Sequence, residues 1–320
     1  VPASLCSGQI AGMIADRLND GGAPPGVSRV VALVHTEGCG CGGGAGDAER
    51  LFLRTIAGHL CHPLVKKALV LEHGCEKTVN DYIGNYLEGE GIDPARFGWA
   101  SVQMDGGIEK AVGGAVQWFQ RELAEAGEDQ IVEASAADLR VALLAIGRPG
   151  EPQARALAMV ARTIAGAGGT VIVPANAPLL EPGPFVEELL ATGRPAPTLA
   201  YGQMATRPGL HVMETPTRHP VETISGLGAT GAEVMVAHLI GAPLPGHPMI
   251  PLIQVSGDKA TLARWPGDLD GSLEGEEPAA LAEKLLDLLC RTASREYTPK
   301  LFGQGGTDFQ LTRGLLGISL

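Results

Sequence analysis

Four of the chain's six cysteines and four of its eight histidines lie between residues 35 and 75. Two stretches in this region share one plan, because HTEGCG (35–40) and EHGCE (72–76) each place a histidine, a glutamate and a cysteine beside glycine. A third stretch, QMDGG (103–107), adds an amide and a carboxylate beside two glycines. Imidazole, thiolate and carboxylate groups bind transition metals and transfer protons. A CxxC pair, typical of structural zinc sites, is absent, which favours a site with open coordination positions.

Each polar stretch ends an apolar run that is typical of a buried strand, namely RVVALVHT (29–36), KALVLEH (67–73) and FGWASVQM (97–104). Ligands of parallel sheets gather where strands end and helices begin. Glycine at these points lets the backbone approach a ligand or another loop closely. We therefore predict that the three strands are neighbours and that their polar ends converge on one rim.

The second half of the chain continues this alternation. Apolar runs at 139–147, 170–175, 210–215 and 249–257 read as strands, and helical spacing is found at 152–166, from Pro184 to Gly193, over 221–239 and around 281–289. Such alternation predicts parallel sheets covered on both faces. The expected fold is α/β with two domains, each a mainly parallel sheet covered by helices. The expected bounds are 1–136 for the first domain and 137–320 for the second, which we expect to be Rossmann-like.

Composition excludes several function classes. The formal net charge of −12 argues against nucleic-acid binding, which needs a cationic face. No apolar run approaches the ~20 residues of a membrane helix, and VPASLCSGQI is not a signal peptide pattern. We expect a cytoplasmic protein with no membrane partner. The Gly-rich stretches match neither GxGxxG in its usual context nor a phosphate loop ending in lysine, so no nucleotide cofactor is predicted.

Several single residues leave alternatives open. Cys61 and Cys290 are predicted to be small core residues, and Cys41 is either a further thiol of the site or filler in a Gly-rich loop. His62 either bonds backbone groups at a helix end or takes part in function, and His59 is expected on a helix surface. Arg218, just after a strand, either holds a substrate carboxylate or belongs to a solvated turn; no role is predicted for Cys6.

Four segments occur in a fixed order between residues 28 and 257: HTEGCG, CHPLVKKALVLEHGCE, QMDGGIEKAV and GLHVMETPTRHPVETISGLGATGA. Together they resemble the catalytic region of the altronate and galactarate dehydratases. The resemblance implies β-elimination of water from a hydroxylated sugar acid with Fe²⁺ or Mn²⁺, in which a base removes the proton beside the carboxylate and the metal stabilises the enediolate. The implied site residues are Cys39, His73 and Cys75 for the metal, His35, Glu37, Glu76 and Asp105 for catalysis, and Gln103, Gly106, Gly107 and Arg218 for the substrate.

The chain also departs from the family pattern. HPLVKK stands where members carry HPNVGG, AIGRPGEPQ stands where GGSDxxSG is expected, and VAHLIGAP replaces an FTTGRG-like segment. The small N-terminal domain of full-length members is missing from the sequence, so a separate small subunit is one expected partner, beside a homo-oligomer and a hydroxy-carboxylate substrate. These departures keep open an alternative function, a non-catalytic or regulatory relative that has lost its substrate loops.

Overall fold

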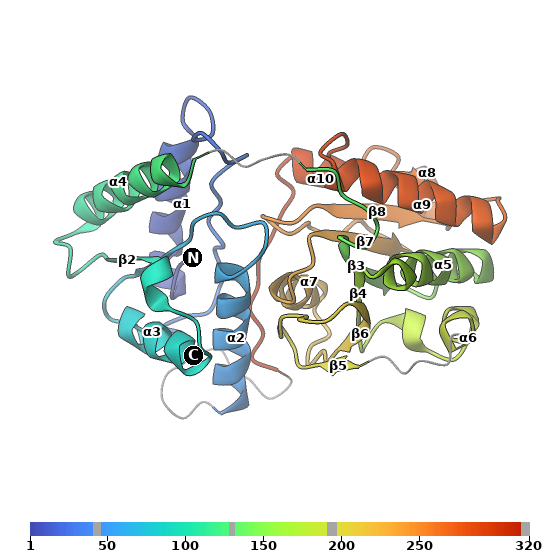
Figure 1. The fold of residues 1–320 in the computed structure, drawn as a ribbon, viewed down its shortest axis with the longest axis horizontal. Helices are drawn as coiled ribbons and strands as arrows, with labels where there is room; N and C mark the ends of the chain where they lie inside the picture. The colour runs from blue at the N-terminus through green and yellow to red at the C-terminus, as the bar shows by residue number, and fades with distance from the viewer. Residues whose placement is uncertain (41–45, 128–131, 191–196, 315–320) are drawn as a thin grey trace. The chain divides into compact units, whose positions relative to one another are not determined.

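The computed structural model describes residues 1–40, 46–127, 132–190 and 197–314 (Figure 1). The chain forms two compact units, of which unit 1 comprises residues 1–132 together with the segment from Phe309, and unit 2 comprises Glu133–Asp308. Both contain parallel strands covered by helices, which confirms the predicted α/β class. No helix in the described part of the chain is both long and apolar enough to span a membrane.

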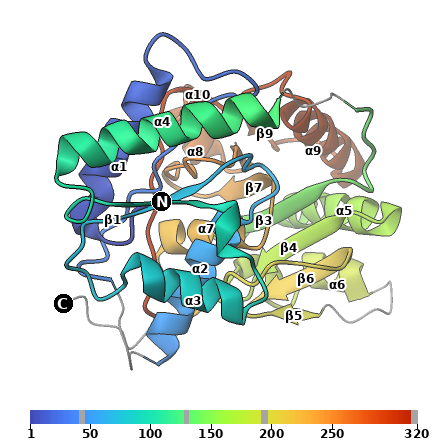
Figure 2. The same ribbon diagram turned by 60° about the vertical axis from the view of Figure 1, so that its left-hand side comes forward.

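Unit 1 is built on two parallel strands, β1 (Leu69–Glu72) and β2 (Gly98–Ser101), with Leu71 opposite Ala100. Its core lies between these strands and two helices, where Ile14, Leu71 and Val112 are buried together. Those helices, α1 and α4, lie side by side in both ribbon views (Figures 1 and 2). The helical elements of unit 1 are α1 (Leu5–Asn19), α2 (Asp47–Leu60), α3 (Asn80–Gly89), η1 (Pro94–Arg96) and α4 (Ile108–Ala126).

The predicted strand over residues 29–36 was wrong. Residues 1–3 occupy the hydrogen-bonding edge of β1, since the Ala3 N–H donates to the Leu71 carbonyl at 2.9 Å and the Leu71 N–H donates to the Val1 carbonyl at 3.0 Å. The 29–36 segment does not pair with a strand but packs against the core, because Leu33 is buried and Val30 contacts the core residues. An apolar run shows that a segment is covered, but not that it joins the sheet.

Unit 2 contains a seven-stranded parallel sheet in the order β5-β6-β4-β3-β7-β8-β9. From β3 the chain winds outward to β4 and β6, then crosses back to β7 and winds the other way, which is the doubly wound strand order of Rossmann sheets. The strands are β3 (Arg140–Ile146), β4 (Thr170–Pro174), β5 (Thr198–Leu199), β6 (Gly209–Met213), β7 (Val234–Leu239), β8 (Leu252–Ser256) and β9 (Gly271–Ser272). The helices are α5 (Glu151–Ala167), η2 (Pro178–Leu180), α6 (Pro184–Leu190), α7 (Pro220–Ala229), α8 (Lys259–Arg264), α9 (Pro278–Ala293) and α10 (Lys300–Gly303).

The single helix predicted over 221–239 was also wrong, because this segment holds α7 and then β7. The run is mostly buried and carries only two carboxylates, Glu222 and Glu233, so its periodicity could not separate a buried helix from a buried strand. Gly231 makes the turn between them with φ +84°, and a Cβ there would lie 2.5 Å from the Met204 sulfur. β7 is buried along its whole length between β3 and β8.

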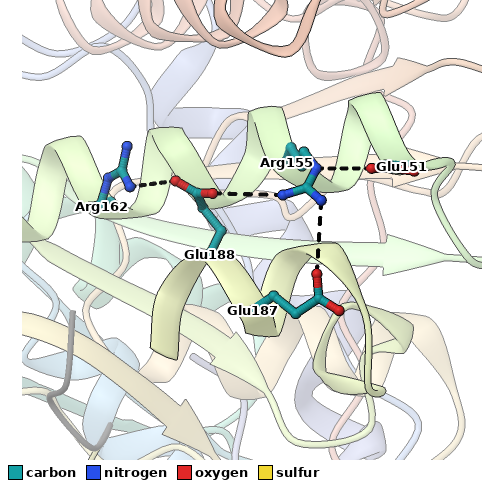
Figure 3. Close-up of polar contacts among 5 residues, drawn as sticks. All are labelled: Glu151, Arg155, Arg162, Glu187 and Glu188. Atoms are coloured by element: carbon teal, nitrogen blue, oxygen red, sulfur yellow. Dashed lines mark hydrogen bonds and ion pairs between the residues drawn. The ribbon is translucent and has the colours of Figure 1, made fainter. Parts of the chain in front are cut away.

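Helix α5 has an apolar face and a charged face. Leu157 and Ile164 are fully buried against the sheet. On the charged face, Arg155 lies 3.1 Å from Glu151, 3.8 Å from Glu187 and 3.9 Å from Glu188. Arg162 pairs with the other oxygen of Glu188, so the two arginines connect α5 to α6 (Figure 3).

We expect the two faces to contribute very differently to stability. Partly exposed ion pairs are screened by water, so Arg155→Ala should lower the free energy of unfolding by only about 1 kcal/mol. Leu157→Ala, in the same helix, should lower it by roughly 2–5 kcal/mol because it leaves a cavity. Denaturant unfolding of both variants compares the two faces, and a larger loss for Arg155→Ala would contradict this assignment.

Candidate functional site

The three polar stretches predicted to converge do meet at the carboxyl ends of β1 and β2. The Gln103 N–H donates to the His73 carbonyl at 3.0 Å, which joins the loops after the two strands. The Lys77 N–H donates to the Cys39 carbonyl at 2.8 Å, which joins the third loop to them. We call this arrangement of residues 37–40, 73–78 and 101–107 the rim; it lies entirely within unit 1.

Glycine permits the close approach of these loops. Gly40 has φ +76°, and a Cβ at this position would lie 2.2 Å from the Thr78 hydroxyl oxygen. Gly74 has φ +109°, and a Cβ there would lie 2.9 Å from Cβ of Gln103. Any larger residue would force the loops apart, so these glycines are required by the convergence itself.

Glu76 organises the loop after β1. Its buried carboxylate accepts the backbone N–H groups of His73, Gly74 at 2.7 Å and Cys75 at 3.1 Å, and the Ser4 hydroxyl at 2.9 Å. Burial on its own would raise the pKa of Glu76, but the hydrogen bonds outweigh it and the pKa lies below its usual value. A carboxylate held by four donors is ionised and poorly suited to taking a proton, so this geometry favours a structural role.

His35 is likewise engaged on both ring nitrogens. Its Nδ1 accepts the Glu37 N–H at 3.2 Å, so the Nε2 carries the proton and donates to the Pro2 carbonyl at 3.0 Å. The ring is 1% exposed and packs edge-on against Phe52. Burial lowers the pKa of His35 to about 4, which keeps it neutral near pH 7. This side chain fixes the first rim loop to the segment beside β1.

Two other predicted catalytic carboxylates also have partners. Glu37 is buried and forms an ion pair with Arg313, which brings the C-terminal segment of unit 1 to the rim. Asp105 accepts the Ser101 N–H at 2.9 Å, closing the turn that leads into α4. The sequence did not predict Arg313, because nothing local in LTRG indicates a partner so distant in the chain.

The side chains that remain accessible at the rim are of a different kind. Cys39, Cys75 and Gln103 are exposed and His73 is half-buried. The Cys75 sulfur lies 3.5 Å from Nδ1 of His73. Desolvation by neighbouring atoms raises the pKa of the Cys75 thiol, and Glu76, Cys6 and Cys39 raise it further. Next to these groups, Gly106 and Gly107 lead into the N-terminus of α4, and a Cβ on Gly106 would lie 3.3 Å from the Lys110 ammonium.

The predicted metal ligands do not form a ready single-ion site. Within the described residues, no group of three or more His, Cys, Asp or Glu side chains is placed to hold one metal ion. Cys39, His73 and Cys75 share the rim, but their donor atoms are not gathered around one point. Cys41 lies outside the described residues.

The structure also places the remaining predicted residues. Arg218 is exposed in unit 2, between β6 and α7, where His219 occupies the N-cap position of the helix. The expectation for His59 was wrong, because it is buried in α2 and bonds the Thr55 carbonyl at 2.7 Å. The prediction that Cys290 is a core residue was wrong as well, since its thiol is exposed on α9. Cys61, also predicted in the core, is half-buried at the end of α2. His62 is buried, and its Nδ1 accepts the Leu64 N–H at 3.1 Å.

Helix α1 is the main feature of the site that the sequence analysis missed. It brings Ser4 to Glu76, and the Leu5 N–H donates to the Glu37 carbonyl at 2.8 Å. Its signal was present in the spacing of Ile10, Ile14 and Leu18, which form its buried face.

Comparison with known families gives two matches. Residues 1–127 match the model described as the second domain of D-galactarate dehydratase/altronate hydrolase. Residues 195–313 match the model described as the C-terminal region of D-galactarate/altronate dehydratase. No curated protein matches the sequence. Both family models describe domains of D-galactarate/altronate dehydratases. The second-domain model matches the first part of the chain and the C-terminal model matches the later part.

Replacing the Glu76 carboxylate tests its structural role. Glu76→Gln turns one acceptor oxygen into an N–H₂ group that faces backbone donors, and we expect the free energy of unfolding at pH 7 to fall by roughly 2 kcal/mol or more. The loss should shrink below about pH 4.5, because the stabilisation from a carboxylate with a lowered pKa disappears as pH falls through that pKa. Denaturant unfolding at several pH values measures this, with the exposed Glu90→Gln as control. An unchanged stability at pH 7 would contradict the role.

The buried neutral state of His35 predicts a second pH effect. The ring has an ordinary pKa of 6.5 when unfolded and about 4 when folded, so protons bind preferentially to the unfolded chain between these values. Its contribution is complete above pH 6.5 and is lost as pH falls through 4, on the order of 3 kcal/mol in total. The stability difference between the wild type and His35→Asn should therefore narrow on acidification. A difference that stays constant from pH 7 to pH 4 would contradict a buried neutral ring.

Proposed function

The chain belongs to the D-galactarate dehydratase/altronate hydrolase family, and from this premise we propose that it is a hydro-lyase that eliminates water from a hydroxylated sugar acid at the rim of unit 1. The observation that supports the proposal most is the meeting of three glycine-bearing loops, which expose thiol, imidazole and amide groups at the ends of β1 and β2. Ligand sites of parallel sheets are found in this position.

The elimination requires a base for the proton beside the substrate carboxylate. His35 and Glu76 are buried and hydrogen-bonded, which leaves His73 as the accessible imidazole of the rim. Its Nδ1 faces the Cys75 sulfur at 3.5 Å, so Nε2 is the nitrogen able to accept a proton. We assign the base role to His73, in place of the metal-binding role that the resemblance implied.

The substrate carboxylate needs a cationic or dipolar partner, because negative charge builds up on it as the enediolate forms. The start of α4 offers backbone N–H groups after Gly107, and Lys110 places its ammonium over Gly106. Helix N-termini favour anions, and α4 is 19 residues long. We therefore place the carboxylate at Gly106, Gly107 and Lys110, with Gln103 available for a substrate hydroxyl.

The Fe²⁺ or Mn²⁺ that the resemblance implied stays a prediction, since Cys39, His73 and Cys75 are not placed around one ion. Without a metal ion, the residues of this chain supply a base and a site for the substrate carboxylate. The glycines of the rim keep side chains out of the space beside these groups.

The alternative, a non-catalytic relative, is supported by one specific observation. Neither family model matches residues 128–194, the segment that holds β3, α5, β4 and α6. The glycine- and serine-rich stretch expected of the family would fall in this segment. A regulatory protein would keep the rim and bind a sugar acid without converting it.

Activity with a panel of aldonates and aldarates, including altronate and galactarate, decides between the two. Formation of a 2-keto-3-deoxy acid is expected with at least one substrate under anaerobic conditions with iron. His73→Gln should lower kcat by about 10²–10⁴-fold, the usual contribution of a general base. An unchanged thermal unfolding midpoint controls for its fold.

Three results are informative. Product formation that persists in His73→Gln would contradict the base assignment. Binding of a sugar acid by the folded wild type without any turnover would favour the regulatory alternative. The absence of both binding and turnover for every sugar acid of the panel would contradict the proposed function.

A further inference from the structure

The loop over residues 35–40 reaches the rim without coming from a strand of its own. The segment that leads into it is not paired with β1 or β2, and the backbone of the loop bonds to the N–H groups of Leu5 and Lys77. The position of this loop therefore depends on its side chains as well. One of the anchoring side chains is that of Glu37, whose buried carboxylate forms an ion pair.

The cation of this ion pair, Arg313, lies in the segment that begins at Phe309 and rejoins unit 1 after the chain has formed unit 2. This C-terminal segment runs beside α2 (Figure 1), where the Phe309 ring packs edge-on against His59 with 4.9 Å between the ring centroids. The Gln310 side chain accepts the Thr36 hydroxyl at 2.7 Å, so the segment also contacts the start of the 35–40 loop.

The ion pair is largely shielded from water, since the side chains of Arg313 and Glu37 are 14% and 9% exposed. Arg313 is the cation that pairs with this carboxylate in the described part of the chain. Without the guanidinium group, Glu37 would be a buried charge with no cation, which is strongly unfavourable. The carboxylate would lower this cost by moving toward water, and the 35–40 loop would move with it.

Movement of this loop would reach the accessible imidazole of the rim. Cys39, two residues after Glu37, accepts the Lys77 N–H on its backbone carbonyl at 2.8 Å. Lys77 directly follows Glu76, whose carboxylate accepts the backbone N–H of His73. A shift at Glu37 is therefore passed to the backbone that carries the proposed base.

The proposed site for the substrate carboxylate is held differently. The Asp105 carboxylate accepts the Ser101 N–H at 2.9 Å, and the Gly107 N–H donates to the Val102 carbonyl at 2.8 Å. These hydrogen bonds lie within the turn that leads into α4 and involve no residue of the 35–40 loop. A shift of that loop should therefore disturb the base more than it disturbs the binding of the carboxylate.

We propose that Arg313 is a positioning residue of the rim, which acts through Glu37 to hold the 35–40 loop and, with it, the loop that carries His73. Arg313 needs no contact with the substrate in this role. The rim is thus completed by a residue that follows unit 2 in the chain. The effect on turnover rests on the proposed function, whereas the effect on the two loops does not.

Steady-state kinetics of Arg313→Ala, with a sugar acid that the wild type converts, tests the effect on turnover. Because a small displacement of a catalytic group is costly, kcat should fall by roughly 10–100-fold, while KM changes by less than about twofold. Adding Glu37→Gln to this variant removes the lone buried carboxylate and should restore part of the lost kcat.

Lys67→Ala is the matched control for the loss of an ion pair. Lys67 pairs with Glu122 at 2.9 Å in the same unit, and both side chains are half-buried. Lys67 precedes β1, at the end of the strand away from the rim. Its replacement should therefore leave kcat at the wild-type value. All variants are compared well below their unfolding midpoints.

Amide hydrogen exchange of the full chain tests the loops without any substrate. In Arg313→Ala the Lys77 amide, which joins the two loops, should exchange at least about tenfold faster than in the wild type, because local opening exposes it. The Val102 amide donates to the Glu72 carbonyl at 3.0 Å and should keep its wild-type rate. Lys67→Ala should change neither rate.

An unchanged exchange rate of the Lys77 amide in folded Arg313→Ala would overturn the proposal. Faster exchange with an unchanged kcat would limit Arg313 to a structural role, and a double variant less active than Arg313→Ala would show that it does not act through Glu37. Either result also overturns the positioning role.

Two further cases keep the outcomes separate. If Arg313→Ala does not fold, Arg313→Lys takes its place, and its Lys77 amide should exchange faster than in the wild type because lysine lacks the planar guanidinium fork; an unchanged rate would then overturn the proposal. If the wild type converts no sugar acid, the proposed function fails, and amide exchange still decides whether Arg313 holds the two loops.

Discussion

The buried carboxylate of Glu76 is the interaction on which the rest of unit 1 depends. It collects three consecutive backbone N–H groups of its own loop and the hydroxyl of Ser4, which lies at the start of α1. One charge therefore fixes the shape of the loop after β1 and ties it to a helix far away in sequence. A buried charge is costly unless it is fully hydrogen-bonded, so this arrangement resists partial opening.

The division of labour at the rim follows from this constraint. Sequence patterns favoured Glu37, His35 and Glu76 as catalytic groups. In the structure these three side chains form the ion pair and hydrogen bonds that hold the loops together. The side chains that remain accessible at the rim are the thiols of Cys39 and Cys75 and one imidazole, that of His73. Polar residues at strand ends can thus be the scaffold of a site as readily as its reactive groups, and only their partners distinguish the two.

Sequence patterns predicted the fold class and the convergence of the three loops, because strand ends and glycine turns are local features. They failed where long-range pairing decides the outcome. The 29–36 segment lost its expected place in the sheet to residues 1–3, and α1 with Cys6 was overlooked although its buried face repeats at helical spacing. The ion pair of Glu37 with Arg313 spans most of the chain, and no local pattern could have indicated it.

Cross-linking of native thiols is the most direct measurement of whether the three loops share one rim. A short reagent with two thiol-reactive ends, applied to the folded chain and followed by peptide mass spectrometry, should join Cys39 to Cys75 while leaving Cys290 singly labelled. Efficient single labelling of both Cys39 and Cys75 with no bridge between them would contradict the account.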